Sequence, residues 1–272
     1  MISFNELLKK KFVESECNNY GIENYDEFRF GKYPPRKDQS FKTGLKNVVK
    51  KIIGYNGQER LLKKYEVQFQ HLYEILEPTS RELLVDVIAL RLLGFSKVKM
   101  KINDARYWEV VDISNALISN SQGEEFSGLK KIDLKQLGYD LRMYFKGIGF
   151  MYTFGLEQYA YKENGTNLVS VETGDVVFDM GACWGDTALY FAQKQSPSDA
   201  QVYSFEFTPG NIEIFSKNVS LNPQFERNIK LVPHPVSDKS GVKIYFTDNG
   251  QGSRIEFEKF EGYTHETTTM AI

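Results

Sequence analysis

The chain has 272 residues, of which 41% are hydrophobic, 26% charged and 14% aromatic, and its formal net charge is −2. A core of appreciable size fits within this length, and the aromatic content argues against long disordered stretches. The small net charge, with an isoelectric point near 6.0, gives no general attraction to phosphate backbones, so we expect no nucleic-acid partner.

The sequence gives no sign of a membrane-spanning or exported protein. No stretch reaches the roughly 18 consecutive apolar residues that a spanning helix needs, and the N-terminal residues lack the apolar segment of an export signal. Cys17 and Cys183 lie far apart, and a tight turn expected around Cys183 disfavours a disulfide. His71, His234 and His265 share no ligand spacing, so we predict no metal site. We expect a cytoplasmic location; the sequence leaves the oligomeric state open.

Residues 1–135 are predicted to form a mainly helical N-terminal region with some β structure. The pair Pro34-Pro35 blocks helix continuation and predicts a boundary or linker. Residues 41–53 place apolar side chains at helical spacing opposite several lysines, which predicts a basic amphipathic helix. A contact with an anionic membrane surface is one interpretation of these lysines; we favour a packed helix whose lysines face water.

A helical hairpin is expected next. Residues 57–77 carry an apolar helical face that Pro78 closes, and Thr79 with Glu82 predicts a capping box for a second helix that ends at Gly94. Three further elements are predicted by their patterns: a strand over 97–102, a helix over 107–118 and a β-hairpin around 139–145.

Residues 136–272 are predicted to form an α/β domain, because strands and helices alternate regularly from Gly174 onward. The expected strands are 175–180, 201–206, 229–232 and 242–246, and the expected helices are 186–195 and 208–222. Strands that alternate with helices in this way build a parallel sheet.

A glycine-containing loop, residues 179–185, joins the first strand to the first helix of this domain. Gly181 and Gly185 let the backbone turn tightly, which leaves amide groups and a helix N-terminus facing a ligand. The two glycines are four apart, unlike the first pair of the dinucleotide motif. An acidic first residue, Asp179, suits the ammonium and sulfonium groups of S-adenosylmethionine (SAM). A glycine-rich turn without a cofactor is the alternative interpretation.

Glu206 strengthens the SAM interpretation. It ends the second strand, where an α/β fold places the acid that accepts hydrogen bonds from both ribose hydroxyls. We expect this carboxylate to face the ligand, so that its removal weakens SAM binding with little effect on fold stability.

Three segments resemble the FkbM family of O-methyltransferases: VFDMGACWGDTALYFA, VYSFEFTPGNIEIFSKNVSLNP and IKLVPHPVSDKSGVKIYF, within residues 174–272. The upstream segments TSRELLVDVIALRLLG and FGLEQYAY are similar to an N-terminal extension found in a bacterial subgroup of that family. The resemblance implies a class I, Rossmann-like methyltransferase sheet that transfers a methyl group from SAM to a hydroxyl, commonly of a sugar, a glycan precursor or a related small molecule.

The resemblance also implies the cofactor contacts. The residues that would bind SAM are Asp179, Gly181, Ala182, Gly185, Asp186, Thr187, Glu206, Phe207, Ser237 and Asp238. Asp238 could instead only shape a turn, and Gln158 and Tyr159 could cover the cofactor or only pack. No catalytic residue is identified.

The given residues hold only the first half of such a sheet, because the strands that follow in the family, and most acceptor contacts, lie beyond Ile272. We therefore expect a C-terminally incomplete domain. A non-catalytic SAM-binding fragment, or a domain that a partner completes, is the main alternative to an active methyltransferase. An NAD-dependent oxidoreductase is a further alternative.

Overall fold

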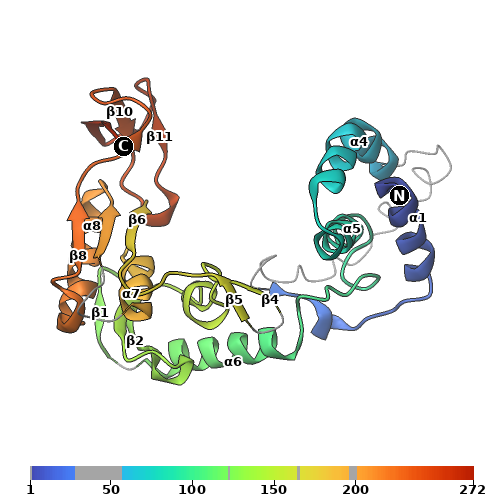
Figure 1. Cartoon of the computed structure of the whole chain (residues 1–272), viewed down its shortest axis with the longest axis horizontal. Helices are drawn as coiled ribbons and strands as arrows, with labels where there is room; N and C mark the ends of the chain where they lie inside the picture. Colours follow the sequence, from blue (N-terminus) through green and yellow to red (C-terminus); the bar gives the residue numbers. More distant parts are fainter. Residues whose placement is uncertain (1, 28–56, 122, 164–165, 196–200) are drawn as a thin grey trace, which may run out of the picture. The chain divides into compact units, whose positions relative to one another are not determined.

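The computed structural model describes residues 2–27, 57–121, 123–163, 166–195 and 201–272 (Figure 1). The basic helix expected at 41–53 and the pair Pro34-Pro35 lie outside these residues. The chain divides into two compact units, Met1–Ala105 and Arg106–Ile272, whereas the sequence predicted a domain boundary after residue 135. None of the described helices combines the length and apolar content needed to cross a membrane.

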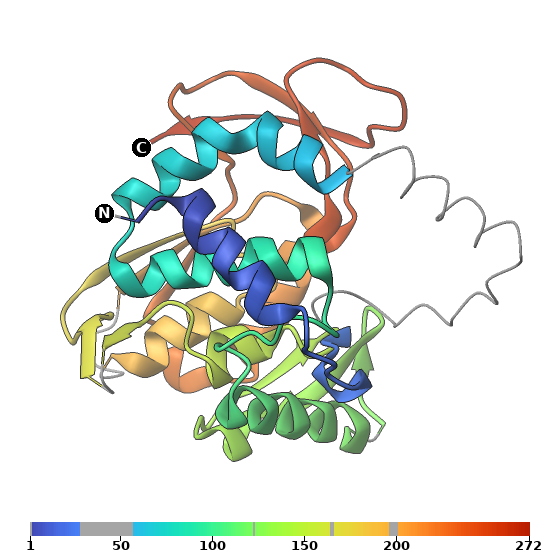
Figure 2. The same ribbon diagram turned by 90° about the vertical axis from the view of Figure 1, so that its right-hand side faces the viewer.

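The first unit packs helices around a small apolar core. Its elements are α1 (Phe4–Ser15), the 3-10 helix η1 (Ile22–Asn24), α4 (Gly57–Ile75) and α5 (Pro78–Leu93). Phe4 and Leu8 lie one turn apart on α1 and are 1% and 2% exposed, so one face of this helix packs against α4 and α5 (Figure 2). Ser3 and Glu6 form a capping box that begins α1.

The predicted capping box of Thr79 and Glu82 is wrong. Helix α5 begins at Pro78 after an N-cap at Glu77, and the Thr79 hydroxyl donates to the Glu77 carboxylate at 3.1 Å. Proline is favoured at the first helical position because its missing N–H group has no intrahelical partner there. Pro78 therefore opens the second helix as well as limiting the first.

The strand predicted at 97–102 is also wrong, because this segment forms turns and irregular backbone. Val98 and Met100 are buried, which explains the alternating pattern. Strand pairing is replaced here by side-chain amides: Nδ2 of Asn18 donates to the carbonyl of Lys97, and Nδ2 of Asn24 to that of Val98, both at 3.1 Å. Burial with period two thus occurs without a neighbouring strand.

The second unit contains a three-stranded parallel sheet in the order β6-β7-β8. Its strands and helices follow in chain order as β6 (Val176–Met180), α7 (Asp186–Lys194), β7 (Gln201–Phe205), α8 (Pro209–Ser220), the 3-10 helix η4 (Pro223–Phe225) and β8 (Ile229–Val232). This alternation matches the predicted strand and helix positions to within one or two residues. The chain is thus a mixed α/β protein with several small sheets.

An antiparallel sheet precedes the parallel one. Its unit begins with α6 (Ala105–Asn120), β1 (Glu125–Phe126), β2 (Leu129–Asp133), the 3-10 helix η2 (Leu134–Leu137), β3 (Arg142–Phe145), the π-helix η3 (Met151–Gly155), β4 (Tyr161–Glu163) and β5 (Thr166–Val169). The hairpin expected around 139–145 exists, but β3 is its second strand and pairs with β2 across η2. The turn therefore lies before 139–145, and the π-helix follows Gly147.

Two asparagines attach helix α8 to strand β3. The Asn218 side chain accepts from the Tyr144 amide at 2.6 Å and donates to the Tyr144 carbonyl at 3.1 Å and the Trp184 carbonyl at 2.8 Å. One turn later, Asn222 bonds the amide and carbonyl of Arg142 in the same manner, at 3.0 and 2.7 Å. A turn of helix and two strand residues have nearly the same rise, so the two amides meet alternate residues of the strand.

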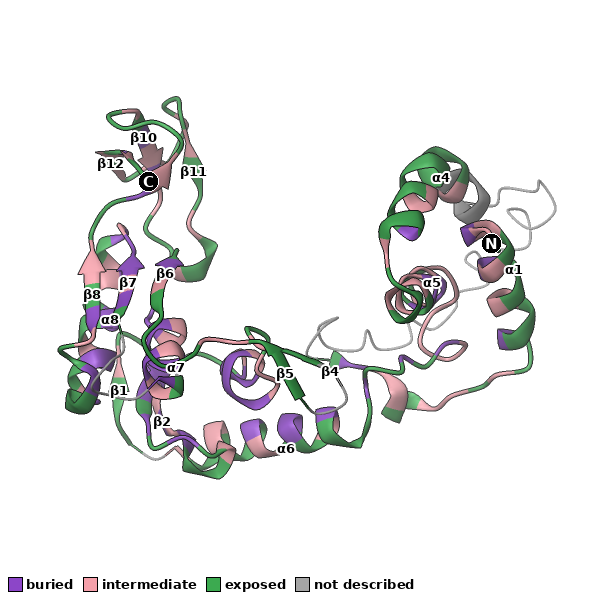
Figure 3. Cartoon of the chain, viewed as in Figure 1, coloured by how far each residue is buried: buried purple, intermediate pink, exposed green. Residues whose placement is uncertain are grey.

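The apolar core of this unit is shared by α7, α8 and both sheets. Buried residues, purple in Figure 3, gather in α7, β2 and β7. The C-terminal part adds β9 (Val236–Ser237), β10 (Lys243–Phe246), the 3-10 helix η5 (Gly250–Gly252), β11 (Ile255–Glu256), β12 (His265–Thr268) and β13 (Met270–Ala271). These strands form an antiparallel sheet, β11-β10-β12, and a short parallel pair of β13 with β9.

Candidate functional site

The predicted glycine loop lies at the carboxyl ends of β6 and β7. Gly181 has φ +87°, and its amide and that of Ala182 donate to the Phe205 carbonyl at 2.9 and 3.0 Å. The loop is thus fixed to the end of β7 as soon as β6 finishes. Ligands of open α/β sheets bind at this edge.

Gly185 is required for two reasons. Its φ of +82° is unfavourable for other residues, and a Cβ atom there would lie 2.8 Å from the Phe215 ring of α8. Gly185 is also the N-cap of α7. A side chain at this position would displace either the helix start or the neighbouring helix.

Asp179 lies at this edge with its carboxylate buried. Burial raises its pKa to about 6, the Thr187 hydroxyl lowers it through a 2.7 Å hydrogen bond, and the charge of Asp186 raises it again. Thr187 thereby joins the end of β6 to the first turn of α7.

Asp186 begins α7 beside Asp179. Burial raises its pKa, while a 3.1 Å hydrogen bond from the Thr153 hydroxyl of η3 lowers it. The Cys183 thiol between these carboxylates has a pKa raised to about 12, first by burial and then by Asp186 and Glu206. Burial and the charge of Asp186 oppose ionisation of Asp179, and a cation beside the loop would favour the ionised carboxylates.

We expected the Glu206 carboxylate to face a ligand; in the structure it is buried against the start of α8. Its side chain is 5% exposed; Oε1 accepts from the Phe207 and Thr208 amides at 2.7 and 2.8 Å, and Oε2 accepts from the Asn211 amide group at 3.2 Å. The carboxylate therefore satisfies donors at the start of α8. A carboxylate has about four acceptor positions, so three N–H donors leave room for a further hydrogen bond.

A cavity of about 310 Å³ opens beside the loop. Its lining comes from the ends of the parallel strands and from the C-terminal strands, and includes Met180, Gly181, Phe207, Ser237, Ile244 and Phe257. The lining is mostly apolar, with His234, Ser237 and Thr269 as polar residues. Small-molecule sites commonly combine an apolar lining with a few polar groups in this manner.

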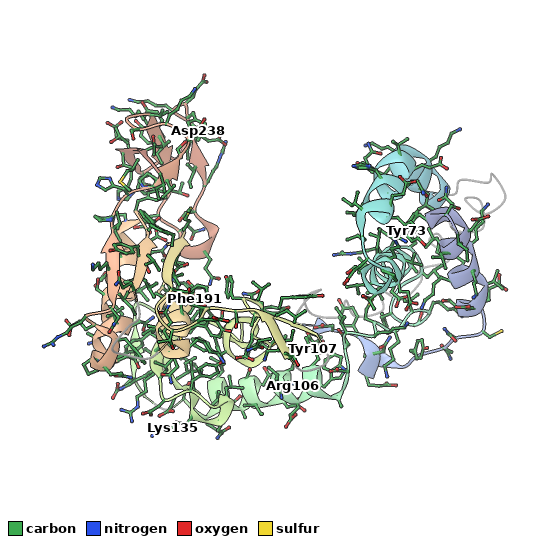
Figure 4. The ribbon with its side chains drawn as sticks, in the orientation of Figure 1. Tyr73, Arg106, Tyr107, Lys135, Phe191 and Asp238 are labelled. Carbon is green, nitrogen blue, oxygen red and sulfur yellow. The ribbon has the colours of Figure 1, made fainter. Side chains whose placement is uncertain are left out.

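The structure brings most, but not all, of the predicted SAM-binding residues to one edge of the parallel sheet. Asp179 to Thr187, Glu206 and Phe207 all lie at the strand ends, and Ser237 lines the cavity. Asp238 is exposed and accepts from the Ser237 hydroxyl at 3.1 Å; Figure 4 places it among the C-terminal strands, away from Phe191 of α7. Its turn-forming interpretation fits this position.

Two residues that hydrogen-bond the predicted carboxylates were not predicted from the sequence. Thr153 reaches Asp186 from a π-helix, which no local pattern predicts, and Asn211 reaches Glu206 from the first turn of α8. Asn211 also accepts from Nε1 of Trp184 at 3.0 Å and so connects the glycine loop to Glu206. The sequence does carry a signal for Asn211: an amide side chain in the first turn of α8 follows an acid, Glu206, at the end of β7.

Within the described part of the chain, no group of three His, Cys, Asp or Glu side chains is placed to hold a metal ion, and Cys17 and Cys183 are free thiols. No protein-family model, curated protein or solved structure matches this chain.

Proposed function

We propose that the chain is a SAM-dependent O-methyltransferase, or the SAM-binding part of one. The observation that carries the proposal is the anionic glycine loop at the carboxyl edge of the parallel sheet. Two buried carboxylates meet here: Asp179 lies at the end of β6, and the charge of Asp186 raises its pKa, so a cationic ligand at this edge would offset their repulsion. A pyrophosphate would meet these carboxylates at the same place, so the loop disfavours the oxidoreductase alternative.

The residues present fit the parts of SAM. Asp179, Asp186 and the amides of the loop would hold the amino-acid end, and Glu206 would accept from a ribose hydroxyl through its remaining position. The apolar cavity beside Phe207 and Ser237 would take the adenine. When bound, SAM supplies a methyl group on a positively charged sulfur.

The chain's contribution to catalysis is positional. The loop is fixed by Phe205, by Thr187 and by the steric limit at Gly185, so a ligand would be oriented without further ordering of the backbone. Orientation of two reactants at contact distance can supply several kcal/mol, up to roughly 7–11. The acceptor class, a hydroxyl of a sugar, glycan precursor or other small molecule, rests on the resemblance to the FkbM family.

Isothermal titration tests the proposal. We expect saturable binding of SAM and of S-adenosylhomocysteine and none of NAD. The matched variant is Gly185→Val, which places atoms against Phe215 and should abolish binding. Binding of NAD without binding of SAM or S-adenosylhomocysteine would contradict the proposal. SAM binding without turnover on any hydroxyl acceptor would favour the non-catalytic alternative.

A further inference from the structure

Tyr159 lies on a segment whose backbone is held firmly beside the acidic loop. The π-helix η3 leads into it: the Leu156 amide donates to the Met151 carbonyl at 2.8 Å, and the Gln158 amide donates to the Tyr152 carbonyl at 2.9 Å. The same π-helix supplies Thr153 to Asp186. π-Helical turns occur frequently at functional sites.

Glu157 fixes the other end of this segment. It adopts φ +50°, an uncommon conformation for a residue other than glycine. Its carboxylate accepts from the Tyr139 hydroxyl at 2.9 Å and forms ion pairs with Lys162 and with Lys194 at the end of α7. Burial raises the pKa of Glu157, but these partners lower it to about 2, so the carboxylate stays charged and attached. Backbone strain that is held by such contacts is a feature of binding sites.

The ring of Tyr159 packs on α7 but stays partly open. Its centroid lies 5.4 Å from that of Phe191 and 6.3 Å from that of Tyr190, and the residue is 45% exposed. Tyr190 follows Asp186 by four residues, so Tyr159 lies against the helix one turn from that carboxylate. Burial raises the pKa of the Tyr159 hydroxyl, and the charges of Asp186 and Asp179 raise it further.

We propose that Tyr159 forms one wall of the site at Asp179 and Asp186 that would bind the positively charged part of SAM. Its ring would contact the sulfonium. The inference rests on the proposed function and deepens it. A held aromatic ring beside two carboxylates is the arrangement that recognises fully substituted cations, which cannot donate hydrogen bonds. The ring would then distinguish SAM from its neutral thioether product, S-adenosylhomocysteine, and favour release of the product.

The experiment compares both nucleosides by isothermal titration on the full chain and three variants. We expect Tyr159→Leu to weaken SAM binding about three- to thirtyfold and to change S-adenosylhomocysteine binding less than about twofold. Tyr159→Phe keeps the ring face and should bind both like the parent. Tyr161→Leu is the matched control, because Tyr161 is a comparably exposed tyrosine two residues along the same segment.

The ratio of the two affinities is measured on the same sample, so it does not depend on the folded fraction. Equal losses for both nucleosides in Tyr159→Leu, no loss, or a Phe variant as weak as the Leu variant would overturn the assignment of Tyr159 alone. A parent chain that binds neither nucleoside would overturn this inference together with the proposed function.

Discussion

Asp179 is the residue whose ionisation should control cofactor binding. Its pKa in the folded chain is about 6, against 3.8 in the unfolded chain. A cation should bind best when this carboxylate is charged. We expect SAM affinity to rise about tenfold between pH 5 and pH 7.5 in isothermal titrations. Asp179→Asn is the control: it should bind SAM weakly, with no comparable rise. A parent affinity that is flat with pH would contradict the role of Asp179.

The same raised pKa predicts the effect of Asp179 on stability. Between about pH 4 and 6 the folded chain holds a proton at Asp179 that the unfolded chain has lost, so this group's stabilisation falls as pH rises through that window. Two pKa units correspond to about 3 kcal/mol, which is an upper estimate. In urea titrations, Asp179→Asn should gain stability relative to the parent as pH rises from 4 to 7. An unchanged difference would mean that the carboxylate is not buried as described.

Glu206 should contribute to both stability and binding, because its carboxylate accepts from three N–H groups at the start of α8. We expect Glu206→Ala to lower the free energy of unfolding by about 2–3 kcal/mol, as lost helix caps and unpaired buried donors do. Glu206→Gln keeps an acceptor oxygen and should retain most of the stability while weakening SAM binding. Urea denaturation with isothermal titration checks both. Full stability of the alanine variant would contradict the capping role.

Among the secondary-structure elements, the attachment of α8 to β3 makes a separate prediction. Asn218 is fully buried, and its removal leaves the Tyr144 backbone and the Trp184 carbonyl without their partner. Asn218→Ala should therefore cost about 2–4 kcal/mol of unfolding free energy in urea. Ser220→Ala, on the exposed side of the same helix, should cost less than about 0.5 kcal/mol. Similar costs for the two variants would refute the attachment.

The strands and helices from β6 to β8 could be predicted because their signals are local. The apolar run of β6, the turn at Gly181 and the proline that begins α8 each act within a few residues. Helix α1 carries a local signal of the same kind, the capping box of Ser3 and Glu6, but it was not predicted.

The remaining differences came from side-chain contacts, some between distant residues and some between residues close in the sequence. Asn18 and Asn24 bond the carbonyls of Lys97 and Val98 in place of a neighbouring strand. The Glu206 carboxylate is buried because Asn211 and the backbone at the start of α8 donate to it. Such partners are chosen by the folded chain as a whole. The placement of the glycine loop and Glu206 at the strand ends could therefore be predicted, but not the protein groups that their carboxylates bind.

At the scale of the whole molecule, strand β6 is an exposed edge of the described parallel sheet. Val176, Phe178 and Met180 are each at least half exposed, and an open apolar strand edge promotes association. We expect concentration-dependent self-association in sedimentation velocity, which Phe178→Thr should reduce. Val169→Thr, at an exposed position of another sheet, should leave it unchanged. A parent chain that stays monomeric at every concentration would contradict this expectation.

The π-helix at Met151–Gly155 sets a different kind of constraint on the molecule. Relative to an α-helix, such a turn holds one residue in excess, and a helix advances by about 100° per residue. Deleting a single residue on either side of Thr153 in this helix would rotate Thr153 out of phase with Asp186 and pull on the segment that Glu157 anchors. A substitution in this segment changes the contacts of one side chain, whereas a change in its length would shift every residue of the segment relative to the site. Among descendants of this chain, we therefore expect the number of residues between Gly147 and Glu157 to vary less than their identities.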